Sequence, residues 1–254
     1  MKTLTRATMI AVLIGLWAGG ASAAGGDDSV RVLQRELADY LTALEYPHGV
    51  VRTFCGSIPS DMLLRLGRRG VEEATWEVRA RRRTAILSIV SPADSTPQWA
   101  FYTGDLDGFF AIVKGDATSG RLLCSETTEM FLLFSQLESV DLTGDNVPEI
   151  TIKGFPYLGA TIAMEIVSWD GVSCRFVTPR EPASKYGIGA TKLIGGDVRF
   201  HDVDGDGVPD VIVQVAQHGT IRKPSTYRAY RYDRAEEAFV EVPFSPEKPD
   251  SAGP

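Results

Sequence analysis

The sequence predicts an all-β protein built from about three repeats of short strands, with one helix near its N-terminus. The main observation is that residues 141–152 align without gaps on residues 202–213, and in both segments spaced acidic residues lead into an aliphatic stretch. Other segments alternate apolar and polar residues around a polar turn, which is the pattern of a β-hairpin. The helix is predicted from apolar residues at helical spacing over residues 29–45.

Residues 1–23 have the features of a secretory signal peptide. Lys2 and Arg6 precede a mostly apolar run over residues 7–18, and the small residues 21–23 fit a cleavage site. The apolar run is too short to span a bilayer comfortably, and no comparable run follows it. We therefore expect an exported protein, periplasmic or secreted, without a membrane span. An uncleaved N-terminal anchor is the alternative.

Composition restricts the partners and the chemistry of the chain. Its 33 acidic residues outnumber the 26 basic ones, for a formal net charge of −7, and this balance argues against generic nucleic-acid binding. Three cysteines in an exported chain permit one disulfide, and the sequence leaves all pairings of Cys55, Cys124 and Cys174 open. Cysteine spacing typical of a zinc site is absent from the sequence.

Residues 24–66 are expected to form the N-terminal helix and a connector. The apolar stripe of that helix predicts core packing, and its members are Val30, Leu33, Leu37, Tyr40, Leu41 and Leu44. The β-repeat domain is expected over residues 67–245. The last residues, 246–254, are rich in proline and polar residues and predict a disordered tail.

Three predicted hairpins mark the repeat units. They cover residues 99–113, 166–177 and 229–240, and each has an aromatic residue before its polar turn and a Phe after it. The acidic segments 141–149 and 202–210 belong to the second and third units. In the first unit, residues 70–80 should carry the equivalent segment, but they contain no alternating carboxylates.

The most informative segment is residues 202–210, here called the Asp202 loop. Carboxylates occupy positions 1, 3, 5 and 9 of an EF-hand-type pattern, with a backbone carbonyl at position 7. The expected ligands are Asp202, Asp204, Asp206, Asp210 and the carbonyl of Val208. Because carboxylates this close repel one another, a hard cation with oxygen ligands would fix the loop. The segment predicts a Ca²⁺ site, with a solvated acidic turn as the alternative.

Residues 141–149, here called the Asp141 loop, repeat this pattern with substitutions. Position 3 is Thr, position 6 is Asn in place of Gly, and position 9 is Glu. The expected ligands are Asp141, Thr143, Asp145, Glu149 and the carbonyl of Val147. We expect the loop with four carboxylates to bind calcium more tightly than this loop with three. Each loop leads into a strand, so a helix–loop–helix calcium sensor is not expected.

These residues carry a family resemblance. The pattern Asp-x-(Asp/Thr)-Gly-Asp-(Gly/Asn)-Val-Pro-(Asp/Glu), with an aliphatic strand and a Trp-Asp-Gly-like hairpin after it, resembles the FG-GAP and VCBS-type repeats. In that family each repeat is one four-stranded blade of a β-propeller, as in the integrin α head, and calcium binds in the loop. The resemblance implies a small or irregular β-propeller-like array of about three four-stranded repeats, with calcium in the two acidic loops.

The chain also departs from the family pattern. The Phe-Gly and Gly-Ala-Pro signatures are not recognisable, and three repeats cannot supply the seven blades of an integrin. Closure of a propeller usually takes at least four blades. Either residues 49–66 complete a small propeller, or the repeats form an open array.

The expected function is a non-enzymatic, calcium-stabilised module that mediates protein–protein interaction. The resemblance suggests an inhibitor of a cell-wall hydrolase as one version. The sequence contains no nucleophile elbow, zinc-protease motif or phosphate-binding glycine loop. One alternative is a hydrolase with an unrecognised carboxylate site, to which His201 and His218 could contribute a general base.

Two further residue groups could form a binding surface. Carbohydrate binding is an alternative function if aromatic residues share an exposed face, although blade packing is the commoner role for Trp99, Tyr157, Trp169, Tyr227, Tyr230 and Tyr232. A basic cluster could meet an acidic partner or act as a solvated strand and turn. It comprises Arg65, Arg68, Arg69, Arg79, Arg81, Arg82 and Arg83.

Overall fold

The computed structural model is mostly β, with three antiparallel sheets and three helices in the part of the chain that it describes. The described residues are 26–68, 84–104, 107–128, 132–156, 161–180, 191–215 and 226–244. The predicted signal peptide, the segment 70–80 and the predicted tail lie outside these ranges. No helix within them is long and apolar enough to cross a membrane.

The N-terminal region contains three helices where the sequence predicted one helix and a connector. They are α1 (Gly26–Ala43), α2 (His48–Ser57) and α3 (Ser60–Arg68). In α2, Val50, Val51 and Phe54 are fully buried, and their spacing places them on one helix face. The suggestion that residues 49–66 complete a propeller is therefore wrong, because most of this segment is helical and packs as a cap.

The first sheet consists of β1 (Thr84–Val90), β2 (Pro97–Gly104), β3 (Gly108–Gly115) and β4 (Gly120–Thr128), each paired with the next. The helices cover one of its faces. Phe54 of α2 stacks on Phe101 of β2, with ring centroids 4.3 Å apart. Six successive residues of β3 are buried, because helices pack on one face of this sheet and the second sheet packs on the other.

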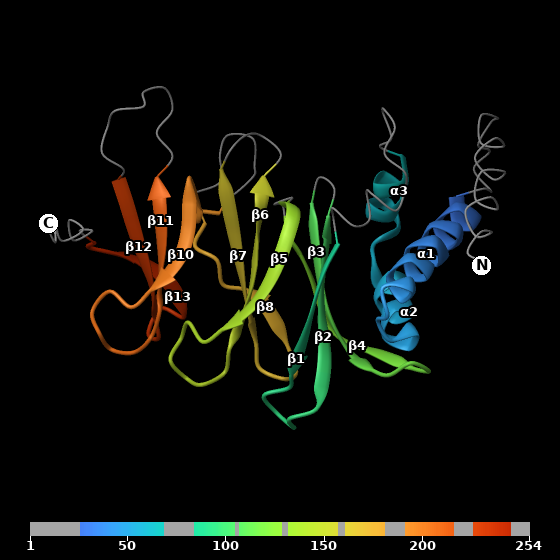
Figure 1. Cartoon of the computed structure of the whole chain (residues 1–254), viewed down its shortest axis with the longest axis horizontal. Helices are drawn as coiled ribbons and strands as arrows, with labels where there is room; N and C mark the ends of the chain where they lie inside the picture. Colours follow the sequence, from blue (N-terminus) through green and yellow to red (C-terminus); the bar gives the residue numbers. More distant parts are fainter. Residues whose placement is uncertain are drawn as a thin grey trace, which may run out of the picture.

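The second and third sheets repeat the same up-and-down strand order. The second consists of β5 (Leu132–Val140), β6 (Glu149–Pro156), β7 (Ile162–Trp169) and β8 (Cys174–Phe176), with β9 (Ile194–Gly195) also paired to β7. The third consists of β10 (Asp197–His201), β11 (Asp210–Val215), β12 (Thr226–Asp233) and β13 (Ala238–Val242). The three sheets lie in a row, and the helices stand beyond the first sheet at one end (Figure 1).

Apolar side chains fill both junctions between sheets. Tyr102 and Phe110 of the first sheet pack with Ile152 and Val167 of the second. At the other junction, residues of the second sheet pack with residues of the third; the cluster includes Met164, Ile166, Val198, Val211, Val213 and Tyr230. Within the second sheet, β7 divides its side chains between these two cores, with Ala163 and Val167 in the first and Met164 and Ile166 in the second, which fixes the register of this strand.

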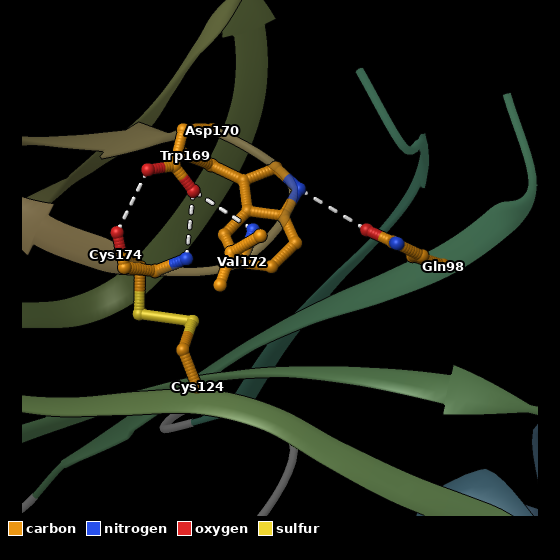
Figure 2. Close-up of a disulfide and its surroundings, with 7 residues drawn as sticks. Gln98, Cys124, Trp169, Asp170, Val172 and Cys174 are labelled. Carbon is orange, nitrogen blue, oxygen red and sulfur yellow. Dashed lines mark hydrogen bonds between the residues drawn. A yellow bond between two sulfur atoms is a disulfide. The ribbon is translucent and has the colours of Figure 1, made fainter. Parts of the chain in front are cut away.

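A disulfide and a buried hydrogen bond also join the first and second sheets. Of the pairings that the sequence left open, the structure contains Cys124–Cys174, between β4 and β8, while Cys55 is a buried free thiol. Close by, the indole N–H of Trp169 donates to the side-chain oxygen of Gln98 at 3.1 Å (Figure 2). Both groups of this hydrogen bond are buried, so it also ties the two sheets together.

The predicted hairpins form, but one of them occupies a different place in its sheet. Residues 166–177 and 229–240 contain the last hairpins of their sheets, β7–β8 and β12–β13, whereas residues 99–113 contain the middle hairpin β2–β3. The true equivalents share an Asx turn. The carboxylates of Asp116, Asp170 and Asp233 each accept hydrogen bonds from the N–H groups two and three residues later. In the first sheet, aromatic residues around a turn did not identify the last hairpin, because both faces of this sheet are buried.

Candidate metal centre

The two acidic loops occupy the same place in neighbouring sheets. The Asp141 loop connects β5 to β6, and the Asp202 loop connects β10 to β11, so each joins the first two strands of its sheet. The gap-free repeat in the sequence therefore corresponds to a structural repeat. In each case the residue at position 9 is the first residue of the second strand.

The carboxylate at position 1 organises each loop through backbone hydrogen bonds. Asp202 accepts from the N–H groups of Gly205 and Gly207 at 2.7 and 2.8 Å. Asp141 accepts from the N–H groups at the same two positions of its loop, at 2.7 and 2.9 Å. These bonds hold the pKa of Asp202 below its usual range, the bond from Gly207 being the main cause. The anionic form of this side chain is therefore favoured.

Position 6 has a left-handed backbone in both loops. Gly207 has φ +87°, and Asn146 at the same position of the other loop has φ +66°. Glycine adopts this conformation without steric cost, and asparagine tolerates it better than most residues. The Gly-to-Asn difference therefore leaves the course of the two loops alike.

Position 9 places a buried carboxylate beneath each loop. Asp210 is 1% exposed and Glu149 is 2% exposed. Each accepts a hydrogen bond from the N–H group at position 2, Val203 in one loop and Leu142 in the other, at 3.0 and 2.8 Å. The pKa of Glu149 is raised to about 7, mainly by burial and to a smaller extent by the nearby Asp145 and Asp141. A bound cation would favour the ionised form of this group.

The Asp202 loop gathers carboxylates that could hold a metal ion. Asp202, Asp204 and Asp210 each offer one oxygen, and these oxygens all lie within 4.8 Å of one another. Asp206, also predicted as a ligand, is not part of this group; its carboxylate accepts the N–H of Val208 at 2.8 Å. The donors are hard oxygen atoms, which suit a cation such as Ca²⁺ or Mg²⁺ better than a softer metal.

An arginine from the neighbouring strand bridges two of these carboxylates. Nη1 of Arg231 lies 2.6 Å from Asp204 Oδ2, and Nε lies 2.9 Å from Asp210 Oδ1. Nη2 also donates to Asp210 Oδ2 at 3.2 Å. Hydrogen bonding to Asp210 is the main cause that raises the pKa of Arg231, so the guanidinium stays charged. The positive charge of Arg231 thus offsets part of the negative charge of the acidic cluster.

The Asp141 loop is arranged differently. The described structure does not bring the carboxylates of Asp141, Asp145 and Glu149 together as it does those of the Asp202 loop. The hydroxyl oxygen of Thr143, at position 3, is buried and has no hydrogen-bond partner among the described residues. A buried polar atom without a partner is costly, and at a ligand position it fits the oxygen-donor set of a calcium loop.

The two acidic loops touch each other at the junction of the second and third sheets. A Cβ atom added at Gly144 would lie 2.6 Å from Cγ2 of Val208, so residues of the two loops are in van der Waals contact. Arg234, in the turn between β12 and β13, donates to the carbonyls of Thr143 and Gly144 at 3.1 and 2.8 Å. The third sheet therefore contacts the loop of the second sheet directly.

The other predicted functional residues do not join this centre. His201 is exposed at the end of β10, and His218 lies outside the described residues. Within the basic cluster, only Arg65 has a described side chain, and it pairs with Asp61 and Asp107 at 2.7 and 2.9 Å. Arg231 and Arg234 were not among the predicted residues, because a cross-strand neighbour is known only once the strand register is known.

The chain matches no protein-family model and no curated protein sequence. Similarity to FG-GAP and VCBS-type repeats therefore stays a prediction from the loop residues.

Proposed function

We propose that this protein is an exported, calcium-stabilised, non-enzymatic module that offers a rigid β-repeat surface to a protein partner. The observation that carries this proposal is the pair of acidic loops, which share one hydrogen-bond arrangement and touch between two sheets. A cation in either loop would relieve carboxylate repulsion at a junction of the scaffold. Its main effect would be on the rigidity of the array.

Calcium is the ion that this donor set supports best. The expected ligands of both loops are carboxylate, hydroxyl and carbonyl oxygens, and calcium accepts six to eight such ligands in flexible geometries. Magnesium demands a stricter octahedron and releases its water reluctantly. Extracellular calcium modules work at roughly 10⁻⁴ to 10⁻³ M, so modest affinity would suffice outside the cell.

The sheets support a propeller-like arrangement of repeats. Each of the three sheets has four consecutive antiparallel strands in sequential order, and neighbouring sheets pack through shared apolar cores. We propose an open array of three such blades, in which the helices cover one face of the first sheet. Export agrees with the signal-like sequence at residues 1–23 and with the Cys124–Cys174 disulfide, since disulfides persist in oxidising compartments.

A protein partner is supported better than a carbohydrate. Carbohydrate platforms need exposed aromatic rings, but Trp169 and Tyr230 are 3% and 1% exposed. Trp99 is half-buried and contacts Tyr46 edge-to-face, while Tyr157 lies outside the described residues. The carboxylates of the Asp202 loop are engaged by backbone groups and Arg231, which supports a structural over a hydrolytic role. A cell-wall hydrolase inhibited by this module is our specific proposal for the partner.

The calcium part of the proposal is tested by thermal unfolding. Millimolar calcium should raise the melting temperature of the wild type, because a ligand that binds only the folded state stabilises it by mass action. Magnesium should raise it much less. Asp202→Asn should lose the part of the gain that comes from the Asp202 loop, whereas Asp197→Asn, which removes a carboxylate of β10 outside the loop, should retain it. Identical melting curves with calcium and with chelator would refute calcium stabilisation.

The partner is tested separately by affinity capture from cell-envelope extract. The expected result is one protein, recovered in stoichiometric amount in calcium and reduced with chelator. Purified cell-wall hydrolase activity should then fall when the module is added. Competition by cell-wall sugars, without any recovered protein, would instead support the carbohydrate alternative.

A further inference from the structure

The connection between the first two strands can be compared across all three sheets. It covers residues 91–96 in the first sheet, 141–148 in the second and 202–209 in the third. The third strand of each sheet runs beside the second strand, so one of its residues lies next to this connection. The pairs nearest to this connection are Trp99–Val113, Ile150–Val167 and Val211–Tyr230, and one residue further along β3, β7 and β12 come Lys114, Ser168 and Arg231.

In the first sheet, a lysine from this position neutralises the connection. Nζ of Lys114 lies 2.8 Å from Oδ2 of Asp94. Asp94 also accepts hydrogen bonds from the N–H and hydroxyl of Thr96 at 3.2 and 2.6 Å, so it organises the turn. The ammonium of Lys114 is the main cause that lowers the pKa of Asp94. Here a side-chain cation is part of the turn itself.

In the third sheet, the arginine at this position takes a similar role. Arg231 bridges Asp204 and Asp210, two of the three carboxylates that could bind a metal ion together. Asp210 is buried, and both of its oxygens accept hydrogen bonds from this guanidinium. The positive charge therefore lies against the same carboxylates that a bound cation would use.

In the second sheet, the equivalent residue carries no charge. Ser168 lies beside the start of β6, where Glu149 is the position-9 carboxylate. Among the described residues, no Lys or Arg side chain forms an ion pair with Asp141, Asp145 or Glu149. Arg234 is near this loop, but its described hydrogen bonds go to backbone carbonyls and not to the carboxylates.

We propose that Arg231 is a built-in cation of the Asp202 loop, which holds the loop folded without metal and competes with calcium for Asp204 and Asp210. The inference rests on the calcium binding proposed above. It also changes the expected order of affinity. With four carboxylates, the Asp202 loop was expected to bind calcium more tightly. Arg231, however, offsets one of those negative charges and occupies two of the ligands. The Asp141 loop, with no such competitor, becomes the tighter site.

Competition follows from charge and from space. A calcium ion close to the guanidinium would be repelled by it, and this repulsion is only partly screened at a half-exposed site. Arg231 must also release Asp204 and Asp210 before their oxygens can turn to the ion. Calcium binding at the Asp202 loop therefore replaces the guanidinium of Arg231 with another cation. Calcium binding at the Asp141 loop displaces no such group among the described residues.

Calcium affinity of each loop in isolation tests the proposal. Asp141→Asn leaves the Asp202 loop as the main site, and in this background Arg231→Gln should tighten calcium binding at least about tenfold in calorimetric titration. In the Asp202→Asn background, which isolates the other loop, Arg231→Gln should change the affinity little. Without calcium, Arg231→Gln should lower the melting temperature, because the carboxylates lose their counter-ion.

Two further variants serve as controls. Arg228→Gln removes the same charge from β12, but Arg228 pairs with Glu241 instead of the loop, so calcium affinity should stay near that of the parent. If Arg231→Gln does not fold in chelator, Arg231→Lys provides the comparison: its single ammonium should give an affinity between those of arginine and glutamine.

Unchanged or weaker calcium binding by Arg231→Gln in the Asp141→Asn background would overturn the proposal while leaving calcium stabilisation intact. If the lysine variant binds calcium no more tightly than the arginine parent, the proposed competition is also overturned. Absence of calcium binding by the wild type and by all variants would instead refute the proposed function, and the competition with it.

Discussion

Gly144 and Gly205 occupy position 4 of the two acidic loops, and both have a left-handed backbone, with φ +68° and +79°. Their surroundings differ. A Cβ at Gly144 would lie 2.6 Å from the Val208 side chain, while a Cβ at Gly205 would meet nothing within 4 Å. This pair of equivalent residues separates the cost of backbone strain from the cost of a steric clash between the loops.

Alanine at these two positions should therefore have unequal effects. Gly205→Ala should destabilise the protein by about 1 kcal/mol, the typical cost of the left-handed conformation for an alanine. Gly144→Ala should cost about 1–3 kcal/mol more, because the new methyl group collides with Val208. Urea unfolding of both variants beside the wild type measures the difference. An equal loss of unfolding free energy in the two variants would contradict close contact between Gly144 and Val208.

At the scale of elements, the Cys124–Cys174 disulfide and the Trp169–Gln98 hydrogen bond fasten the same junction. The disulfide joins strands at corresponding edges of the first two sheets and spans 50 residues of sequence. Cross-linking over such a separation restricts the unfolded chain strongly. The third sheet is attached differently, by a shared apolar core, by contact between the loops and by the hydrogen bonds of Arg234.

Removing the disulfide should weaken the fold substantially. The double substitution Cys124→Ala, Cys174→Ala should lower the free energy of unfolding by up to about 4 kcal/mol, the chain-entropy estimate for a loop of this length. Guanidinium unfolding with and without reductant measures it. Reductant should lower the stability of the wild type and leave the double variant unchanged, since its remaining cysteine is buried. A wild type that is indifferent to reductant would contradict this assignment.

The elements also show where sequence reasoning succeeds. The α1 helix, the last hairpins of the second and third sheets and the strands after both acidic loops follow from local periodicity. The helical cap over residues 48–68 did not, because short apolar stretches are ambiguous between helix and strand. In the first sheet, burial on both faces removed the alternation that marks a strand, so its hairpin was aligned one strand too early.

The candidate site, too, was predicted only in part from the sequence. The sequence predicted the positions of the two loops, which depend on residues close in the chain. The backbone hydrogen bonds that the first aspartate of each loop accepts were not predicted. The sequence also indicated that Asp202, Asp204 and Asp210 could share a cation. Arg231 was missed because it is distant in sequence from the loop and becomes its neighbour only through pairing of β11 with β12. Side-chain cations that complete such loops require knowledge of the strand register.

At the scale of the whole molecule, the three sheets form a row whose two ends differ. Helices α1 to α3 pack on the first sheet, and the two acidic loops lie at the junction of the second and third (Figure 1). The disulfide secures the first junction covalently, whereas the described contacts across the second are apolar packing, the loops and polar contacts such as the Arg175–Glu237 ion pair. Calcium would therefore act where the array lacks a covalent link, and it would stiffen the position of the third sheet.

We predict that this second junction binds calcium, and equilibrium calcium binding measures it most directly. Titration of the wild type in millimolar calcium should reveal two sites. Asp141→Asn and Asp202→Asn should each remove or greatly weaken one site, and the double variant should lose both. A wild type that binds no calcium in this range, or binding that survives the double substitution, would contradict the account.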